Sequence, residues 1–291
     1  HRDLHLSIRR QRQMCIRDRA SCGERLFNVL DNEEYLVEND EVNNAPELGV
    51  LEFNNVSFSF PGKDQPKILE DINLRLEPGF TLGIIGSQGS GKSTLTQLIP
   101  RFYDPTSGDI RFNGVDLRDY KLNSLREAVS LVQQDTFLFT SSVKNNILYG
   151  EPWATGEQVT CAASIAQLHE QIAHLPQGYK TLIGERGVSL SGGQRQRLNI
   201  SRSLILNAKI LIFDDSTSAI DAATEQKIQE GLKLGASNRI TIIISHRLVS
   251  LMHADEIIYM EDGKITENGT HEDLLQLGGH YARLYQLQKT F

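Results

Sequence analysis

A glycine-rich run between an apolar segment and a helical pattern constrains this chain more than any other feature. Residues 86–93 read Gly-Ser-Gln-Gly-Ser-Gly-Lys-Ser and are followed by Thr94. Residues 80–85 before the run are apolar, as in a strand buried on both faces, and residues 94–102 after it have helical spacing. Glycines let successive backbone N–H groups turn inward around phosphate oxygens. The strand, turn and helix together predict a loop that binds a nucleoside triphosphate.

The residue types in this run indicate how it would hold its ligand. Lys92 supplies a positive charge for the β- and γ-phosphates, and the Ser93 hydroxyl can ligate Mg²⁺. A second buried strand, residues 210–213, runs directly into Asp214, which we expect to hold Mg²⁺ through water. By themselves these features leave open GTPases, kinases, helicases and transport ATPases. The nucleotide-binding residues expected from the run are Gly86, Ser87, Gln88, Gly89, Ser90, Gly91, Lys92, Ser93 and Thr94.

Composition excludes several classes of protein. Hydrophobic residues make up 39% of the 291 residues and charged residues 23%, which is typical of a globular domain and not of a disordered or collagen-like chain. The apolar runs are far shorter than the about 20 residues of a membrane span, so we expect a soluble chain without a secretory signal. The net charge of −7 argues against nucleic acid as a partner. Three scattered Cys residues indicate neither a disulfide framework nor a zinc site.

The apolar patterns predict an α/β fold. Residues 51–60 and 72–76 alternate between apolar and polar side chains, as antiparallel strands do. The helical pattern of residues 222–234 separates two apolar strands, and this β-α-β succession implies a parallel sheet. We therefore expect a P-loop NTPase with a mostly parallel core sheet, an antiparallel β subdomain and an α-helical subdomain at about residues 135–207. The continuous apolar runs assigned to the core sheet are residues 80–85, 210–213 and 239–245.

Three segments follow one another along the chain. Residues 1–19 carry six Arg and two Asp, a charge of +4 within a chain of −7. We interpret them as a non-native or disordered arm, because residues 9–19 resemble translated library-adapter sequence; a solvated basic arm and a membrane-surface or nucleic-acid patch are the alternatives. Residues 20–47 contain a helical pattern and then an acidic, Asn-rich linker. Residues 48–291 are expected to form the nucleotide-binding domain.

A second glycine-containing run carries a family resemblance. Residues 190–194 read Leu-Ser-Gly-Gly-Gln, are followed by Arg-Gln-Arg, and lie upstream of Asp214. The run resembles the signature of ATP-binding cassette (ABC) ATPases, and the resemblance covers about residues 48–291. Ser191 is expected to cap a helix whose N-terminal end attracts anions. The resemblance implies that the helical subdomain carries this signature and that ATP held by a second subunit is contacted by Ser191, Gly192, Gly193 and Gln194.

Four further positions resemble motifs of the same family. Phe60 matches the aromatic residue that stacks on adenine, where the family more often has Tyr. Gln134, in Leu-Val-Gln-Gln-Asp, matches the glutamine whose side-chain oxygen reaches Mg²⁺. Asp221 ends a Ser-Ala-Ile-Asp segment similar to one that crosses the dimer interface, and His246 resembles the switch histidine that hydrogen-bonds the γ-phosphate. The resemblance thus implies ATP and Mg²⁺ as ligands, with Mg²⁺ held by Ser93, Gln134 and Asp214.

The resemblance extends to a subtype. Residues 184–188 resemble a segment peculiar to exporters, and residues 20–30 resemble the cytoplasmic end of the last transmembrane helix in exporters that fuse membrane and ATPase domains. This implies the C-terminal part of a half-transporter at the cytoplasmic face of the cell membrane, with a transmembrane domain as partner. Lipid, peptide and drug export all stay open. The alternative is a soluble ABC protein of DNA repair or translation. It is disfavoured because the sequence contains a single cassette and no heptad repeats of a coiled coil.

One residue departs from the family pattern. Active members carry Glu as the general base for the attacking water, whereas this sequence has Asp215. The ordinary pKa values of Asp and Glu are similar, but Asp is shorter by about 1.3–1.5 Å. A displacement of about 1 Å can cost on the order of a hundredfold in rate. We therefore expect a site that binds ATP and hydrolyses it slowly, with the catalytic positions Asp215, His246, Lys92 and Gln134.

The same change implies an assembly. In heterodimeric ABC exporters one subunit carries Asp at this position and still lends an intact signature to its partner. We therefore hypothesise a heterodimer whose other subunit has the catalytic Glu. A homodimer in which Asp215 suffices, and a nucleotide-gated binding module with negligible hydrolysis, are the alternatives.

Overall fold

The computed structural model describes residues 23, 36, 43–46, 48–62, 65–184, 190–234 and 238–289. The chain divides into two compact units, residues 1–37 and 38–291, and every helix and strand named below lies in the second. The predictions for residues 1–19, for residues 20–30 apart from Gly23, and for residues 185–188 of the exporter-like segment lie outside the described residues. Within the described ranges, no helix has the length and apolar character needed to cross a bilayer.

The core of the second unit is a six-stranded sheet in the order β10-β9-β3-β8-β7-β6. Strand β9 pairs antiparallel with β10, and all the other neighbours are parallel, which confirms the predicted mostly parallel sheet. Residues of β3, β7 and β8 are almost entirely buried, as expected of strands covered on both faces. The strands are β3 (Thr81–Gly86), β6 (Val129–Val132), β7 (Ile210–Asp214), β8 (Ile240–Ile244), β9 (Glu256–Glu261) and β10 (Lys264–Gly269).

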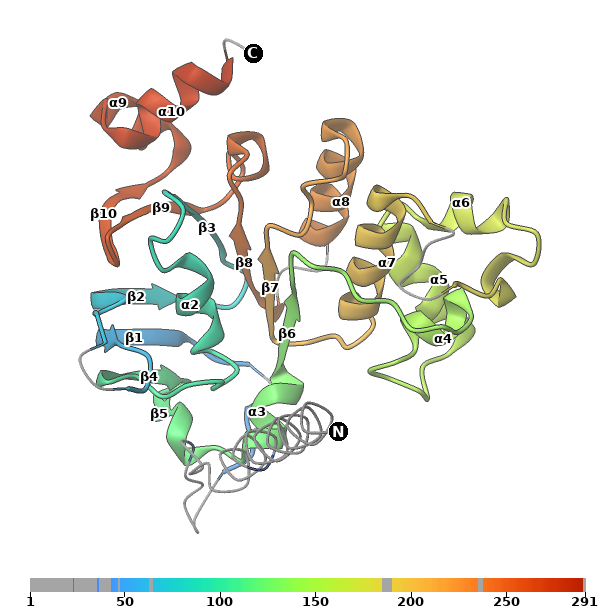
Figure 1. Ribbon diagram of the computed structural model, residues 1–291, viewed down its shortest axis with the longest axis horizontal. Coiled ribbons are helices and arrows are strands. Elements are labelled where there is room, and N and C mark those ends of the chain that lie inside the picture. Colours follow the sequence, from blue (N-terminus) through green and yellow to red (C-terminus); the bar gives the residue numbers. More distant parts are fainter. Residues whose placement is uncertain are drawn as a thin grey trace, which may run out of the picture. The chain divides into compact units, whose positions relative to one another are not determined.

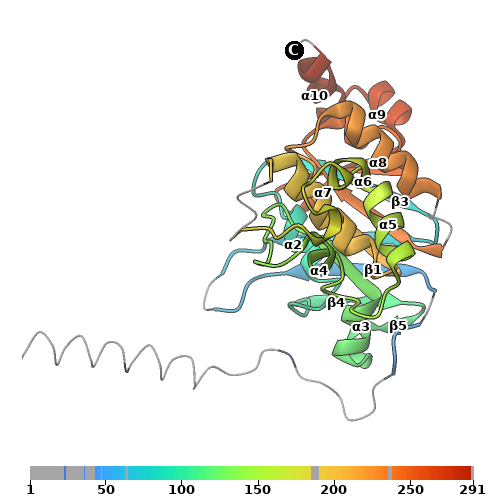
Figure 2. The same ribbon diagram turned by 90° about the vertical axis from the view of Figure 1, so that its right-hand side faces the viewer.

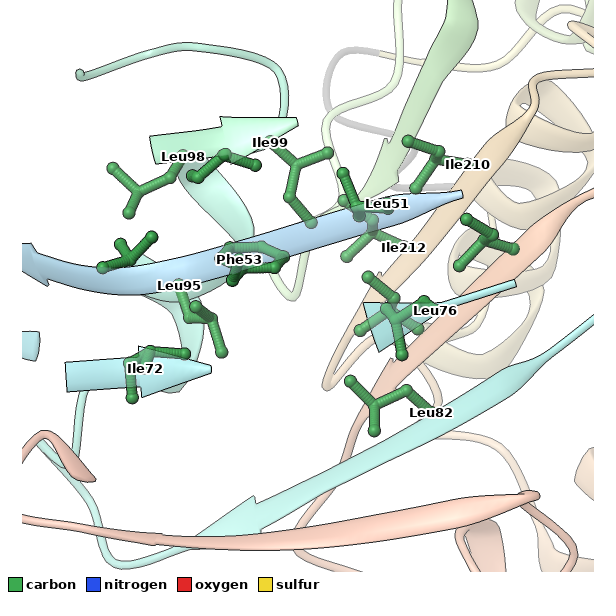
Figure 3. Packing of buried hydrophobic residues seen from close by; sticks show 14 of the residues in the cluster. Leu51, Phe53, Ile72, Leu76, Leu82, Leu95, Leu98, Ile99, Ile210 and Ile212 are labelled. Carbon is green, nitrogen blue, oxygen red and sulfur yellow. The ribbon is translucent and has the colours of Figure 1, made fainter. Parts of the chain in front are cut away.

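A second, antiparallel sheet of four strands has the order β2-β1-β4-β5. It comprises β1 (Leu51–Phe58), β2 (Leu69–Leu76), β4 (Ser107–Phe112) and β5 (Val115–Asp116). Its apolar face packs with α2 (Lys92–Gln97) and the core strands into one cluster, so the antiparallel sheet and the phosphate-loop helix share a core. Figure 3 shows this packing for Leu51, Phe53, Ile72, Leu76, Leu82, Leu95, Leu98, Ile99, Ile210 and Ile212.

The helical subdomain gathers beside the β6 and β7 edge of the core sheet (Figure 1, Figure 2). It has its own apolar cluster, to which Ile147, Val159, Ile172 and Leu198 contribute. Within this subdomain the chain turns at Gln167, whose φ of 55° separates one helix from the next. The elements are α4 (Val143–Ile147), α5 (Gly156–Ile165), α6 (His169–Ala173), η2 (Gly178–Lys180) and α7 (Gly192–Leu204).

The remaining helices connect or flank the strands. Helix α2 ends at Gln97, earlier than the expected residue 102, because residues 98–102 continue as turns. Helix α8 spans Ala222–Leu234, as its apolar spacing predicts. The others are η1 (Leu117–Asp119), α3 (Leu122–Ala128), η5 (Leu248–Ser250), α9 (His271–Leu277) and α10 (His280–Lys289).

Candidate functional site

The phosphate loop leaves the core sheet at a residue that only glycine can fill. Gly86 ends β3 with a φ of 153°, and a Cβ there would lie 2.0 Å from the carbonyl oxygen of Met260 on β9. At the other end of the loop, Gly91 precedes α2 with a φ of 92°. The loop is therefore held between a buried strand and a helix, as its sequence predicts.

The Lys92 side chain hydrogen-bonds to other residues of its own phosphate loop. Its Nζ donates to the carbonyl oxygens of Gly86 at 3.0 Å and Ser87 at 2.6 Å, and to Oγ of Ser90 at 3.3 Å. Burial lowers the pKa of this ammonium, and the charges of Asp214 and Asp215 oppose that shift. The positive charge is thus already positioned at the mouth of the loop, where phosphates would replace its backbone partners.

Asp214 and Ser93 form the candidate Mg²⁺ ligands. Oγ of Ser93 donates to Oδ1 of Asp214 at 3.1 Å, which joins the start of α2 to the end of β7. Burial raises the pKa of Asp214, while the hydrogen bond from Ser93 and the charge of Lys92 oppose the shift. A hydroxyl and one carboxylate fit Mg²⁺, which prefers hard oxygen ligands and completes its shell with water and substrate phosphates.

Asp215 joins two more of the predicted catalytic side chains. Its Oδ1 lies 2.9 Å from Nδ1 of His246, and its Oδ2 accepts from Nε2 of Gln134 at 3.3 Å. The second contact leaves the amide oxygen of Gln134 available as a metal ligand. Burial raises the pKa of Asp215, and the neighbouring His246 opposes this. Gln134 and His246, which lie 81 and 31 positions from Asp215 in the sequence, thus both contact its carboxylate.

These groups surround a cavity of about 670 Å³. At its far side the Phe60 ring meets Phe58 and Tyr103 edge-on, with centroids 5.1 and 5.3 Å away, and is itself 37% exposed. Among the predicted loop residues, Ser87 and Ser90 do not line this cavity; Lys92 donates to the backbone carbonyl oxygen of Ser87 and to Oγ of Ser90. The cavity is lined by Phe60, Ile68, Gly86, Gln88, Gly89, Gly91, Lys92, Ser93, Thr94, Gln134, Asp214, Asp215, Ile244 and His246.

The signature residues form a separate surface. Ser191 caps α7 in a reciprocal pair with Gln194, in which each side chain accepts from the other residue's backbone N–H. A Cβ on Gly193 would lie 2.9 Å from the carbonyl oxygen of Ala219, so the start of α7 packs closely on the segment after β7. None of residues 191–194 lines the described cavity.

Asp221 also lies outside the cavity. Its Oδ1 accepts from the backbone N–H of Thr224 at 3.0 Å, a contact that lowers the pKa of Asp221 and caps the start of α8. Sequence reasoning placed Asp221 at a subunit interface, and in this chain alone it is an exposed helix cap.

Two residues that the sequence did not single out hold the segment between β7 and α8. Gln196 of α7 donates to Oγ of Ser218 at 3.0 Å and accepts from the N–H of Ala219 at 2.8 Å. From the other side, the Arg247 guanidinium donates to the carbonyl oxygens of Ser218 and Ile220. Their sequence positions, two residues after Gln194 and directly after His246, are the signals that could have pointed to them.

Comparison with known proteins finds similarity of this chain to one family. Residues 69–218 match the family model described as ABC transporter. The chain is 45% identical over 267 residues to the uncharacterized ABC transporter ATP-binding protein YknU of Bacillus subtilis (strain 168), covering 91% of this chain and 46% of that protein. It is 47% identical over 265 residues to a putative multidrug export ATP-binding/permease protein of Staphylococcus aureus (strain NCTC 8325 / PS 47), covering 90% and 46%.

A solved structure agrees in fold. A bacterial Atm1-family ABC exporter with ATP bound superposes with a TM-score of 0.85 at 37% identity, covering 94% of this chain and 48% of that chain. The chain therefore spans about half the length of the curated relatives and of the solved exporter that it matches.

Proposed function

The chain belongs to the ABC transporter family, and from this membership we propose that it couples ATP binding and hydrolysis to export of a substrate across a membrane. Its partner would be a transmembrane domain at the cytoplasmic face of the cell membrane. The names of the relatives support this proposal, because one is a putative multidrug export ATP-binding/permease protein and another is an exporter with ATP bound.

One observation carries the proposal. Five polar side chains lie around a single cavity beside the phosphate loop, in two hydrogen-bonded groups: Ser93 with Asp214, and Gln134 with Asp215 and His246. A triphosphate in the loop would bring its terminal phosphate between these groups, with the base against Phe60. Such an arrangement suits phosphoryl transfer to water, in which positioning and charge stabilisation do most of the work.

The side chains divide this work. Lys92 binds the β- and γ-phosphates. Asp215 accepts a proton from the water that attacks the γ-phosphorus, while the bond from that phosphorus to the β–γ bridging oxygen breaks and ADP leaves. His246 orients the γ-phosphate, and Gln134 holds the second oxygen of Asp215. Ser93, Asp214 and Gln134 would hold Mg²⁺, which supplies charge neutralisation for the phosphates when bound.

Two features support a second subunit in each site. Ser191 and Gly192 lie outside the cavity of their own chain, so their helix end is available to contact a triphosphate bound by another chain. The short side chain at Asp215 favours slow hydrolysis in this chain's own site. We therefore infer a heterodimer, in which the partner supplies a site with a catalytic Glu and receives this chain's intact signature.

The test is phosphate release by the full-length transporter, purified alone and together with the product of the neighbouring gene. We expect substantial turnover only with the partner present. Robust turnover of the protein alone, unaffected by Asp215→Asn, would contradict the heterodimer. Asp215 is also compatible with a nucleotide-gated binding module that hydrolyses almost no ATP. In the same assay, ATP binding without phosphate release in either preparation would support this second function.

A further inference from the structure

The loop that carries His246 is anchored on either side by the buried residues Ser245 and Leu248. His246 lies between β8 and η5, and its side chain is 65% exposed. An exposed side chain on a short loop is placed mainly by its backbone, so the groups that fix the backbone decide where the imidazole points. Hydrogen bonds to that backbone are therefore the contacts of interest.

A single side chain from a distant helix fixes the loop at two points. Nε2 of Gln288 donates to the carbonyl oxygen of His246 at 2.6 Å, and Oε1 of Gln288 accepts from the N–H of Leu248 at 3.0 Å. A carboxamide offers a donor and an acceptor in one plane, and both are used here. Gln288, which lies 42 residues after His246 in the chain, thus hydrogen-bonds to the loop backbone on both sides of Arg247.

The helix that carries Gln288 is firmly attached elsewhere. Tyr281 of α10 is fully buried in a cluster with Leu248, Leu251 and Leu274, and Oε2 of Glu267 accepts from its N–H at 3.1 Å. Gln288 follows Tyr281 by seven residues, which is two helical turns, so both lie on the same face of α10. Figure 1 shows α10, in red, next to α9 and the β9–β10 pair. The buried Tyr281 thus anchors the same face of α10 from which Gln288 contacts the His246 loop.

We propose that Gln288 is a positioning residue for His246. By holding the backbone on both sides of Arg247, it keeps the imidazole directed at the cavity and within reach of Asp215. The inference deepens the proposed function, because it rests on the role given there to His246. It predicts that loss of the carboxamide impairs turnover without impairing ATP binding.

The experiment measures ATP hydrolysis by the full-length transporter carrying Gln288→Leu. Gln288 is at the surface, so this change keeps a side chain of similar size and opens no cavity. We expect kcat to fall about tenfold, because misplacing a catalytic group by about 1 Å can cost up to about a hundredfold and the loop is displaced by less. KM for ATP should stay within about twofold of its value in the unmodified protein. Gln288→Glu keeps the acceptor for Leu248 but places a carboxylate oxygen against the carbonyl oxygen of His246, so its kcat should also fall below that of the unmodified protein. The matched control is Gln226→Leu, on the exposed face of α8, where the amide donates to Glu230; it should behave like the unmodified protein.

A double-mutant cycle with His246→Ala distinguishes positioning from a general structural role. If Gln288 acts through His246, Gln288→Leu costs nothing further once His246 is gone. Additive losses, or full kcat in Gln288→Leu while His246→Ala is impaired, would overturn the inference alone. Full turnover in His246→Ala would instead overturn the proposed function of that histidine. Amide exchange at Leu248 tests the contact without activity: it should accelerate in Gln288→Leu and not in Gln226→Leu, and unchanged exchange would also overturn the inference.

Discussion

Lengthening the side chain at Asp215 should increase the turnover of this site. The carboxylate of Asp215 contacts Nδ1 of His246 at 2.9 Å and Nε2 of Gln134 at 3.3 Å, so its position is set by neighbours on both sides. Asp215→Glu extends the carboxylate by about 1.3–1.5 Å. If about 1 Å of misplacement costs on the order of a hundredfold, kcat should rise by about 10- to 100-fold, equivalent to about 1.4–2.7 kcal/mol in the barrier.

A stability cost should accompany the gain. Asp215 has a φ of 45°, a conformation that Asp and Asn adopt more readily than Glu. We therefore expect a small decrease in Tm, of a few degrees, alongside the faster turnover. KM for ATP should change little, because Asp215 is separate from the loop groups that bind the phosphates.

The assay is phosphate release from Mg-ATP by the assembled transporter. In a heterodimer the partner's catalytic Glu is replaced by Gln, so that turnover reports on the site built on this chain. Asp215→Asn, which keeps the size and removes the base, should be slower than the unmodified protein. Turnover that stays the same or falls in Asp215→Glu, or that is unaffected in Asp215→Asn, would refute the reasoning about reach.

Three further predictions concern the loop and its metal ligands. Because burial raises the pKa of Asp214 above its ordinary 3.8, the folded state binds more protons than the unfolded state between the two pKa values, and stability falls as pH rises through that range. Asp214→Asn should therefore raise the Tm of the nucleotide-free protein at pH 7, by an amount that shrinks as pH falls toward 3.8 in thermal melts; a lower Tm at pH 7 would contradict this. Gly86→Ala places a methyl 2.0 Å from the Met260 carbonyl oxygen and should lower Tm by more than about 10 °C, whereas Gly89→Ala, with no atom within 4 Å of its Cβ, should lower it far less; equal losses would refute the steric argument. Lys92→Ala should weaken ATP binding about 10- to 100-fold in equilibrium titrations, since it removes charge-assisted hydrogen bonds, and unchanged affinity would exclude it from the phosphate site.

The parts of the site with local causes could be predicted from the sequence. The phosphate loop follows from a buried strand, a turn with three glycines and the start of a helix, all within residues 80–97. Asp214 follows from the end of another buried strand. Strands β9 and β10 were not predicted: β9 (Glu-Ile-Ile-Tyr-Met-Glu) has only a short apolar run, and β10 (Lys-Ile-Thr-Glu-Asn-Gly) is polar and partly exposed, as loops are. The Asp262-Gly263 turn between them was the available signal.

The contacts between distant residues could not be predicted. Gln134, Asp215 and His246 each match a motif, but their hydrogen bonds depend on how β6, β7 and β8 are ordered in the sheet. Gln196 and Gln288 are ordinary polar residues in helical patterns, and only the packing of α7 and α10 brings them to their backbone partners. Holding a distant loop requires no particular periodicity or motif around the residue, so this role cannot be recognised from the sequence pattern.

The central claim is that this chain contributes to two nucleotide sites, one through its phosphate loop and one through its signature. Hydrogen exchange of the assembled transporter with and without Mg-ATP tests it most directly. The account predicts slower amide exchange both in residues 86–94 and in residues 191–194 when ATP is bound. Slower exchange in residues 86–94 alone would contradict the shared sites, and unchanged exchange in both segments would contradict the nucleotide site itself.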